Sequence, residues 1–127
     1  MNYIEFIEKQ KAKPKKKSWV DINRKGKHTF EREACTYMVQ SNCEDKVFVL
    51  ERLRILENDG PLSYPETATV GSQHYRLGYY IVGKIGKRVG VWTWGQFCPI
   101  LPPNDLFKLI NLAKEEGTIL PEHEHTI

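Results

Sequence analysis

The chain has 127 residues, of which 40% are hydrophobic and 28% charged, which predicts one globular domain spanning residues 1–127. No apolar run is long enough to cross a membrane, and Met1 to Gln10 lacks the apolar core of a signal peptide, so we expect a cytoplasmic protein without membrane contact. The net charge is +3, but Lys9 to Lys27 holds nine Lys and Arg residues against the single acid Asp21, which defines a basic N-terminal arm (residues 1–27).

This arm begins with a predicted helix. Asn2 can cap it, and Pro14 marks its latest end, because the residue before a proline avoids helical dihedral angles. Ser18 to Ile22 alternates like a strand, and Asn23 to Lys27 predicts a turn. The apolar positions of the helix follow helical spacing: Tyr3, Ile4, Phe6 and Ile7.

Two longer strands are expected next. Phe30 to Gln40 fits both a helical stripe and a strand pattern. We favour a strand because Ser41 to Asp45 is a good loop and Lys46 to Leu56 is a clear strand after it. Arg52 and Arg54 would then share one face of the second strand.

A second pair of strands follows a long irregular loop, Leu62 to Gln73, of a length that is often functional or mobile. The strands are expected at His74 to Gly83 and Val89 to Phe97, with a basic turn from Lys84 to Arg88. In the last strand Trp92 and Trp94 would point to the same side.

The C-terminal part predicts a helix that starts at Pro103 and stops at Gly117, with Asp105 near its positive end. Residues 118–127 are expected to fray. Together these elements predict an α+β fold: an antiparallel sheet of about four or five strands, with an N-terminal and a C-terminal helix packed on one face. The buried stripe of the C-terminal helix would be Leu106, Leu109, Ile110 and Ala113.

Ile81 to Val89 contains Gly83-Lys84-Ile85-Gly86, which resembles the Gly-x-x-Gly loop of the KH family of RNA-binding domains. The resemblance covers about nine residues, and it implies close approach of a nucleic-acid backbone. In KH domains this loop joins two helices, whereas its flanks here are strand-like. A β-hairpin turn is therefore the expected structure, and no family assignment follows.

Aromatic residues interleaved with cations indicate a nucleic-acid-binding module without catalysis. Trp92, Trp94 and Tyr80 would stack on bases, at about 1–3 kcal/mol for each base. The competing interpretation packs these rings under the terminal helices and makes the basic arm a solvated linker. The phosphate contacts in the first interpretation would be Lys84, Lys87 and Arg88 of the turn, and Lys13, Lys15, Lys16, Lys17, Lys25 and Lys27 of the arm.

Three other functions remain open. The hairpin and the long loop could enclose a nucleotide-like ligand, as in a signal-sequestering accessory protein of a phage or mobile element. In that hypothesis Arg52, Arg54 and Arg76 would contact phosphates and Tyr75 would lie beside the ligand. The same aromatic hairpin could instead form a protein-interaction or homo-oligomer surface.

The last alternative is a metal-dependent nuclease using Glu31, Glu33 and Asp21. The sequence contains no Walker loop, dinucleotide fingerprint or catalytic triad spacing. Cys35, Cys43 and Cys98 lack the spacing of a zinc site and are expected to be free thiols. We therefore expect no catalytic residue, no metal and no cofactor.

Overall fold

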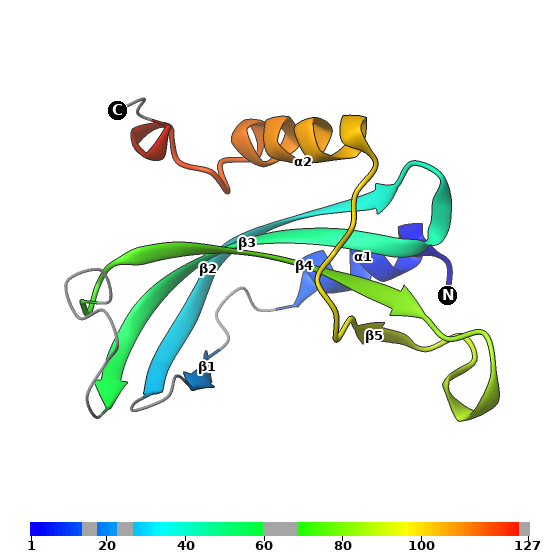
Figure 1. Ribbon diagram of the computed structural model, residues 1–127, viewed down its shortest axis with the longest axis horizontal. Helices are drawn as coiled ribbons and strands as arrows, with labels where there is room; N and C mark the ends of the chain where they lie inside the picture. Colours follow the sequence, from blue (N-terminus) through cyan, green and yellow to red (C-terminus); the bar gives the residue numbers. More distant parts are fainter. Residues whose placement is uncertain (14–17, 23–26, 60–68, 125–127) are drawn as a thin grey trace.

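The computed structural model describes residues 1–13, 18–22, 27–59 and 69–124 (Figure 1). Within these ranges the strands form one antiparallel five-stranded sheet in which neighbours in sequence are neighbours in space. No helix in the described ranges is both long and apolar enough to span a bilayer. The elements are α1 (Tyr3–Ala12), β1 (Ser18–Ile22), β2 (Lys27–Gln40), β3 (Cys43–Asp59), β4 (Gln73–Val82), β5 (Trp92–Trp94) and α2 (Pro103–Glu115), with 3-10 turns η1 (Gly86–Arg88) and η2 (Pro121–His123).

Helix α1 begins as its sequence predicts. The backbone N–H of Glu5 donates to the Asn2 side chain at 2.9 Å, and the Glu5 carboxylate accepts in return from the Asn2 backbone. This capping box satisfies donors that the first helical turn leaves without partners. The helix ends at Ala12, and Lys13 is already extended, as expected for the residue before Pro14.

The long hairpin of β2 and β3 dominates the sheet. Phe30 to Gln40 is a strand, as favoured, but the expected loop up to Asp45 is shorter in the structure. A turn at residues 41–42 joins the strands, because two residues suffice to reverse an antiparallel pair. The pairing shifts between Arg32 and Ala34, and this bulge leaves Glu33 as an extra residue in β2.

The second hairpin is also confirmed, although β5 covers only Trp92–Trp94 instead of Val89 to Phe97. Gly90 takes a φ of 75° beside η1, a conformation that favours glycine and interrupts the strand on this side. On the other side, the Gly95 N–H donates to the Tyr79 carbonyl at 2.7 Å, but regular pairing stops there.

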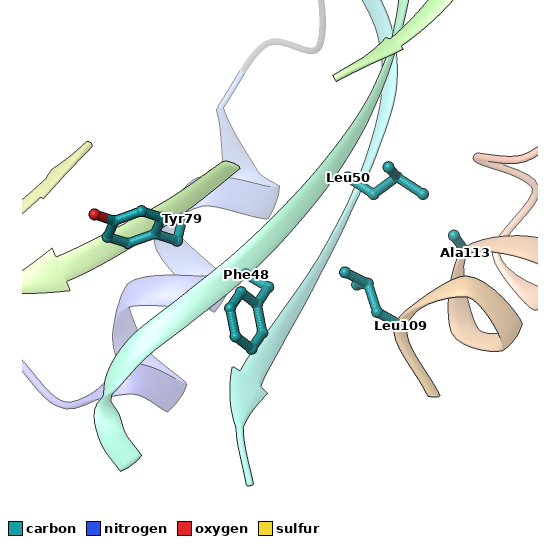
Figure 2. Packing of buried hydrophobic residues seen from close by; sticks show 5 residues of the cluster. All are labelled: Phe48, Leu50, Tyr79, Leu109 and Ala113. Carbon is teal, nitrogen blue, oxygen red and sulfur yellow. The ribbon is translucent and has the colours of Figure 1, made fainter. Parts of the chain in front are cut away.

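The central strand β3 is apolar on both faces. Phe48 and Leu50 contact α2 through Leu109 and Ala113, as Figure 2 shows. Val47 and Val49 belong to a different cluster, which contains Phe6 of α1. Because side chains alternate along a strand, these contacts separate onto opposite faces of the sheet.

The α+β class, the antiparallel sheet and the two terminal helices are thus confirmed. We expected both helices on one face, but these contacts place α1 on one side of β3 and α2 on the opposite side. We call the side that contacts Phe6 the α1 face and the other side the α2 face. A strand that is buried on both sides explains the continuous apolar run Val47 to Leu50.

Residues 118–127 were expected to fray, but residues 118–124 have a defined structure, and residues 125–127 lie outside the described ranges. Gly117, with a φ of 80°, ends the helix, and Thr118 is then buried. The hydroxyl groups of Thr36 and Thr118 lie 2.8 Å apart. The Leu120 N–H donates to the Tyr75 hydroxyl at 3.1 Å, so this segment is held against the sheet.

Candidate functional site

The predicted aromatic residues lie together on the α1 face. Tyr80 pairs with Trp94 on one side and with Val47 on the other, and paired residues share a face. Trp92, two residues before Trp94, points to the same side, as the sequence predicts. This face also carries Phe6 of α1, so the helix and the aromatic residues are neighbours.

Trp92 and Tyr80 support α1. The rings of Trp92 and Phe6 are stacked with centroids 4.8 Å apart, and the Tyr80 ring lies 5.0 Å from Phe6. The indole N–H of Trp92 donates to the Met1 carbonyl at 2.9 Å. Both rings are half-buried, so the competing interpretation, packing under a terminal helix, describes these two residues well.

Trp94 is different, because 38% of its surface remains exposed. Its ring lies across Gly78, where an added Cβ atom would come within 2.3 Å of the indole. The Tyr80 and Trp94 rings form a T-shaped pair with their centroids 5.2 Å apart. The guanidinium carbon of Arg76 lies 4.7 Å from the Trp94 centroid, within cation–π distance.

A buried carboxylate holds Arg76 in place. The Arg76 Nε lies 2.8 Å from Glu51, and Glu51 is only 2% exposed. On its other side, Glu51 lies 3.3 Å from Nη1 of Arg32, which also reaches the Tyr37 hydroxyl at 3.4 Å. Two guanidinium groups therefore share the two oxygens of one carboxylate.

The phenols around this cluster stay neutral near neutral pH. Burial raises the pKa of Tyr37 above its ordinary value. Burial also raises the pKa of Tyr80, and the negative charge of Glu51 adds to this effect. The hydroxyl groups can thus donate hydrogen bonds without adding negative charge to the α1 face.

The predicted phosphate-binding cations fall into three groups. Lys87 and Arg88 are exposed in η1, whereas Lys84 lies 2.9 Å from the Asp45 carboxylate. Lys13 is exposed directly after α1. The structure describes the backbone of Lys27 as the start of β2, while Lys15, Lys16, Lys17 and Lys25 lie outside the described residues.

The residues proposed for a nucleotide-like ligand lie on two faces. Arg52 and Arg54 share the α2 face, as predicted, whereas Arg76 pairs with Glu51 and lies on the α1 face. The Nε atoms of Arg52 and Arg54 lie 3.2 and 2.6 Å from the carboxylate of Glu33. The three arginines therefore do not converge on one point. Tyr75, also on the α2 face, binds the segment after α2.

On the α2 face, the Glu33 carboxylate forms ion pairs with both Arg52 and Arg54. Partial burial opposes its ionisation, but hydrogen bonds from Gln73, Arg54 and Arg52 outweigh burial and hold its pKa below the usual value. With its oxygens occupied in this way, Glu33 is poorly placed to serve as the metal ligand that the nuclease hypothesis requires.

Metal-ligating side chains are scattered in the part of the chain that the structure describes. No three His, Cys, Asp or Glu residues in those ranges lie close enough together to hold an ion. Cys35, Cys43 and Cys98 are free thiols.

The ion pairs that Glu51 makes with Arg32 and Arg76 were not predicted from the sequence. A signal for Glu51 was present, because it follows Val47 and Val49 at intervals of two and precedes Leu53. A carboxylate in such an apolar series must face the interior and must therefore find a cationic partner. Nothing comparable marks Arg32, whose partner lies 19 positions away on the next strand.

Comparisons with family models, curated proteins and solved structures found no match to the chain. The function is therefore inferred from the geometry of the described residues.

Proposed function

We propose that this protein is a non-catalytic module that binds single-stranded nucleic acid on its α1 face. Trp94 would stack on a base beside Arg76, and exposed lysines at the end of α1 and in η1 would contact phosphates. The observation that carries the proposal is the exposed surface of Trp94 on the same face of the sheet as helix α1, whose C-terminal end carries exposed lysines.

Helix α1 supplies cations to this face. Phe6 packs on Trp92 and Tyr80, which fixes the helix against the sheet. Three exposed lysines then follow in its C-terminal half and at its end: Lys9, Lys11 and Lys13. Phosphates neutralised by these side chains would release counterions, so we expect affinity to fall steeply with salt.

The three aromatic residues would have separate roles. Trp94 is the most exposed of the three rings and would be the one that stacks, whereas Trp92 and Tyr80 would act by positioning α1. Glu51 would fix the guanidinium group of Arg76 beside Trp94 before the ligand arrives, which reduces the ordering that binding requires. The exposed Lys87 and Arg88 of η1 would extend the positive surface.

Fluorescence anisotropy with labelled single-stranded DNA and RNA tests the proposal, in a series of rising salt concentrations. Replacing Trp94 with Leu should weaken binding by about 5- to 150-fold, which corresponds to one lost stacking contact of about 1–3 kcal/mol. A matched control is Phe107→Leu, which removes an exposed ring from α2 on the other side of the sheet. Equal affinities of both variants, or no binding at low salt, would contradict the proposal.

A second candidate function is self-association through the hairpin. Three apolar side chains in or after it are strongly exposed: Ile85, Phe97 and Ile100, at 85%, 80% and 82%. Exposed apolar groups of this kind favour a protein contact. Sedimentation velocity would show a concentration-dependent dimer that Ile85→Ser weakens, whereas a monomer at all concentrations would exclude this function.

A further inference from the structure

A pocket of about 280 Å³ lies where the end of α1, the edge of β2 and the segment after α2 meet. Among the described residues, three cationic side chains and the acidic Glu116 line it. The C-terminal ends of α1 and α2 add about half a negative charge each. The positive charges beside the pocket are those of Lys11, Lys13 and Arg32, and Arg32 is paired with Glu51.

Arg32 gives this pocket a donor without an acceptor. The residue is only 7% exposed, and its Nη1 atom already serves Glu51 and Tyr37. Its Nε atom is buried and has no hydrogen-bond partner among the described residues. A buried donor left in this state costs about 1–3 kcal/mol, so a shift of the Arg32 side chain that brought Nε to an acceptor in the pocket would be favourable.

We propose that this pocket binds a phosphate group. Guanidinium groups offer parallel donors that suit the oxygens of phosphate, and two lysines beside the pocket can compensate its charge. The volume leaves space for a group attached to the phosphate, so both inorganic phosphate and a terminal phosphate of a nucleotide fit the chemistry. The site does not include Trp94 and goes beyond the proposed stacking function.

Glu51 connects the pocket to the α1 face. It binds Arg32 through one oxygen and Arg76 through the other, so it orients both guanidinium groups. Arg32 is a binding residue in this proposal, and Glu51 is a positioning residue that fixes the direction of Arg32.

Isothermal titration with sodium phosphate and with thymidine 5′-phosphate, at constant ionic strength, tests the site. The double variant Lys11→Gln/Lys13→Gln should bind at least about 10-fold more weakly, a change of about 1.4 kcal/mol. Both lysines are exposed, so the fold should tolerate the change. The matched control is Lys108→Gln/Lys114→Gln, which removes two lysines from α2 and should leave phosphate binding unchanged.

Each outcome bears on the proposal. Binding of either compound that is lost in the pocket variant and kept in the control supports it, and thymidine as a third titrant shows whether the phosphate is required. Absence of binding by both compounds up to about 10 mM, or equal weakening in both double variants, overturns it. Phosphate should also shift the Nε–H resonance of Arg32 in ¹⁵N spectra, and an unmoved resonance during saturable binding would place the ligand elsewhere.

The outcome is separate from that of the stacking experiment. Phosphate binding does not require Trp94, so Trp94→Leu should leave it unchanged even if the nucleic-acid proposal fails.

Discussion

The Nε atom of Arg76 lies 2.8 Å from Oε1 of Glu51, which joins a half-exposed cation to a carboxylate that is almost completely buried. The same guanidinium group lies beside the ring of Trp94. A surface aromatic residue is thus coupled to the interior of the sheet through one arginine. This coupling gives Trp94 a fixed position and gives the protein an internal charge that must stay paired.

Replacing Glu51 with Gln should lower the free energy of unfolding by about 3–5 kcal/mol, because Arg32 and Arg76 would keep their charges without a carboxylate between them. Urea denaturation followed by circular dichroism measures this loss. Glu57→Gln is the control, since Glu57 is exposed on the same strand and should change stability by less than about 0.5 kcal/mol. Equal stability of the two variants would show that the Glu51 pairs are weak.

Gly78→Ala should destabilise the protein by about 1–3 kcal/mol and displace Trp94, because the new methyl group would occupy the space of the indole. Urea denaturation measures the first effect, and Trp94 emission in a Trp19→Phe/Trp92→Phe background reports the second. In the double variant Gly78→Ala/Trp94→Ala the clash is absent, so the two destabilisations should be strongly non-additive. Simple additivity would mean that the ring does not lie on Gly78.

Protonation of Glu33 should account for part of the loss of stability in acid. Its pKa is lower in the folded protein than in the unfolded chain, so its contribution is complete above the unfolded value of about 4.3 and is lost as the pH falls through the folded value. Unfolding free energies measured between pH 7 and pH 2 should therefore fall less steeply in Glu33→Gln than in the unchanged protein. Parallel curves would indicate that the Arg52 and Arg54 contacts do not stabilise the charged form.

The local signals in the sequence predicted much of the fold. Asn2 and Pro14 bound α1, and Pro103 and Gly117 bound α2, because caps and breakers act within a few residues. The faces that the helices cover depend on contacts between distant segments. Val47 to Leu50 is apolar at every position, so it offers both faces equally and does not indicate which helix covers which.

The candidate site was predictable only in part. Alternation placed Trp92 and Trp94 on one side, but their different exposure depends on where Phe6 docks, which local patterns do not encode. The pairing of Glu51 with Arg32 and Arg76 depends in turn on strand register. The bulge at Glu33 changes that register within β2, and no local residue pattern predicted this bulge.

The most direct test of the proposed function uses Trp94 as its own reporter. In a Trp19→Phe/Trp92→Phe protein, Trp94 is the remaining tryptophan, and titration with a short single-stranded oligonucleotide should quench its emission. We expect saturable quenching at low salt, with the same affinity as anisotropy gives and a marked loss of affinity as the salt concentration rises. Oligonucleotide binding that leaves the Trp94 emission unchanged would contradict the account, because the ring would then not contact a base.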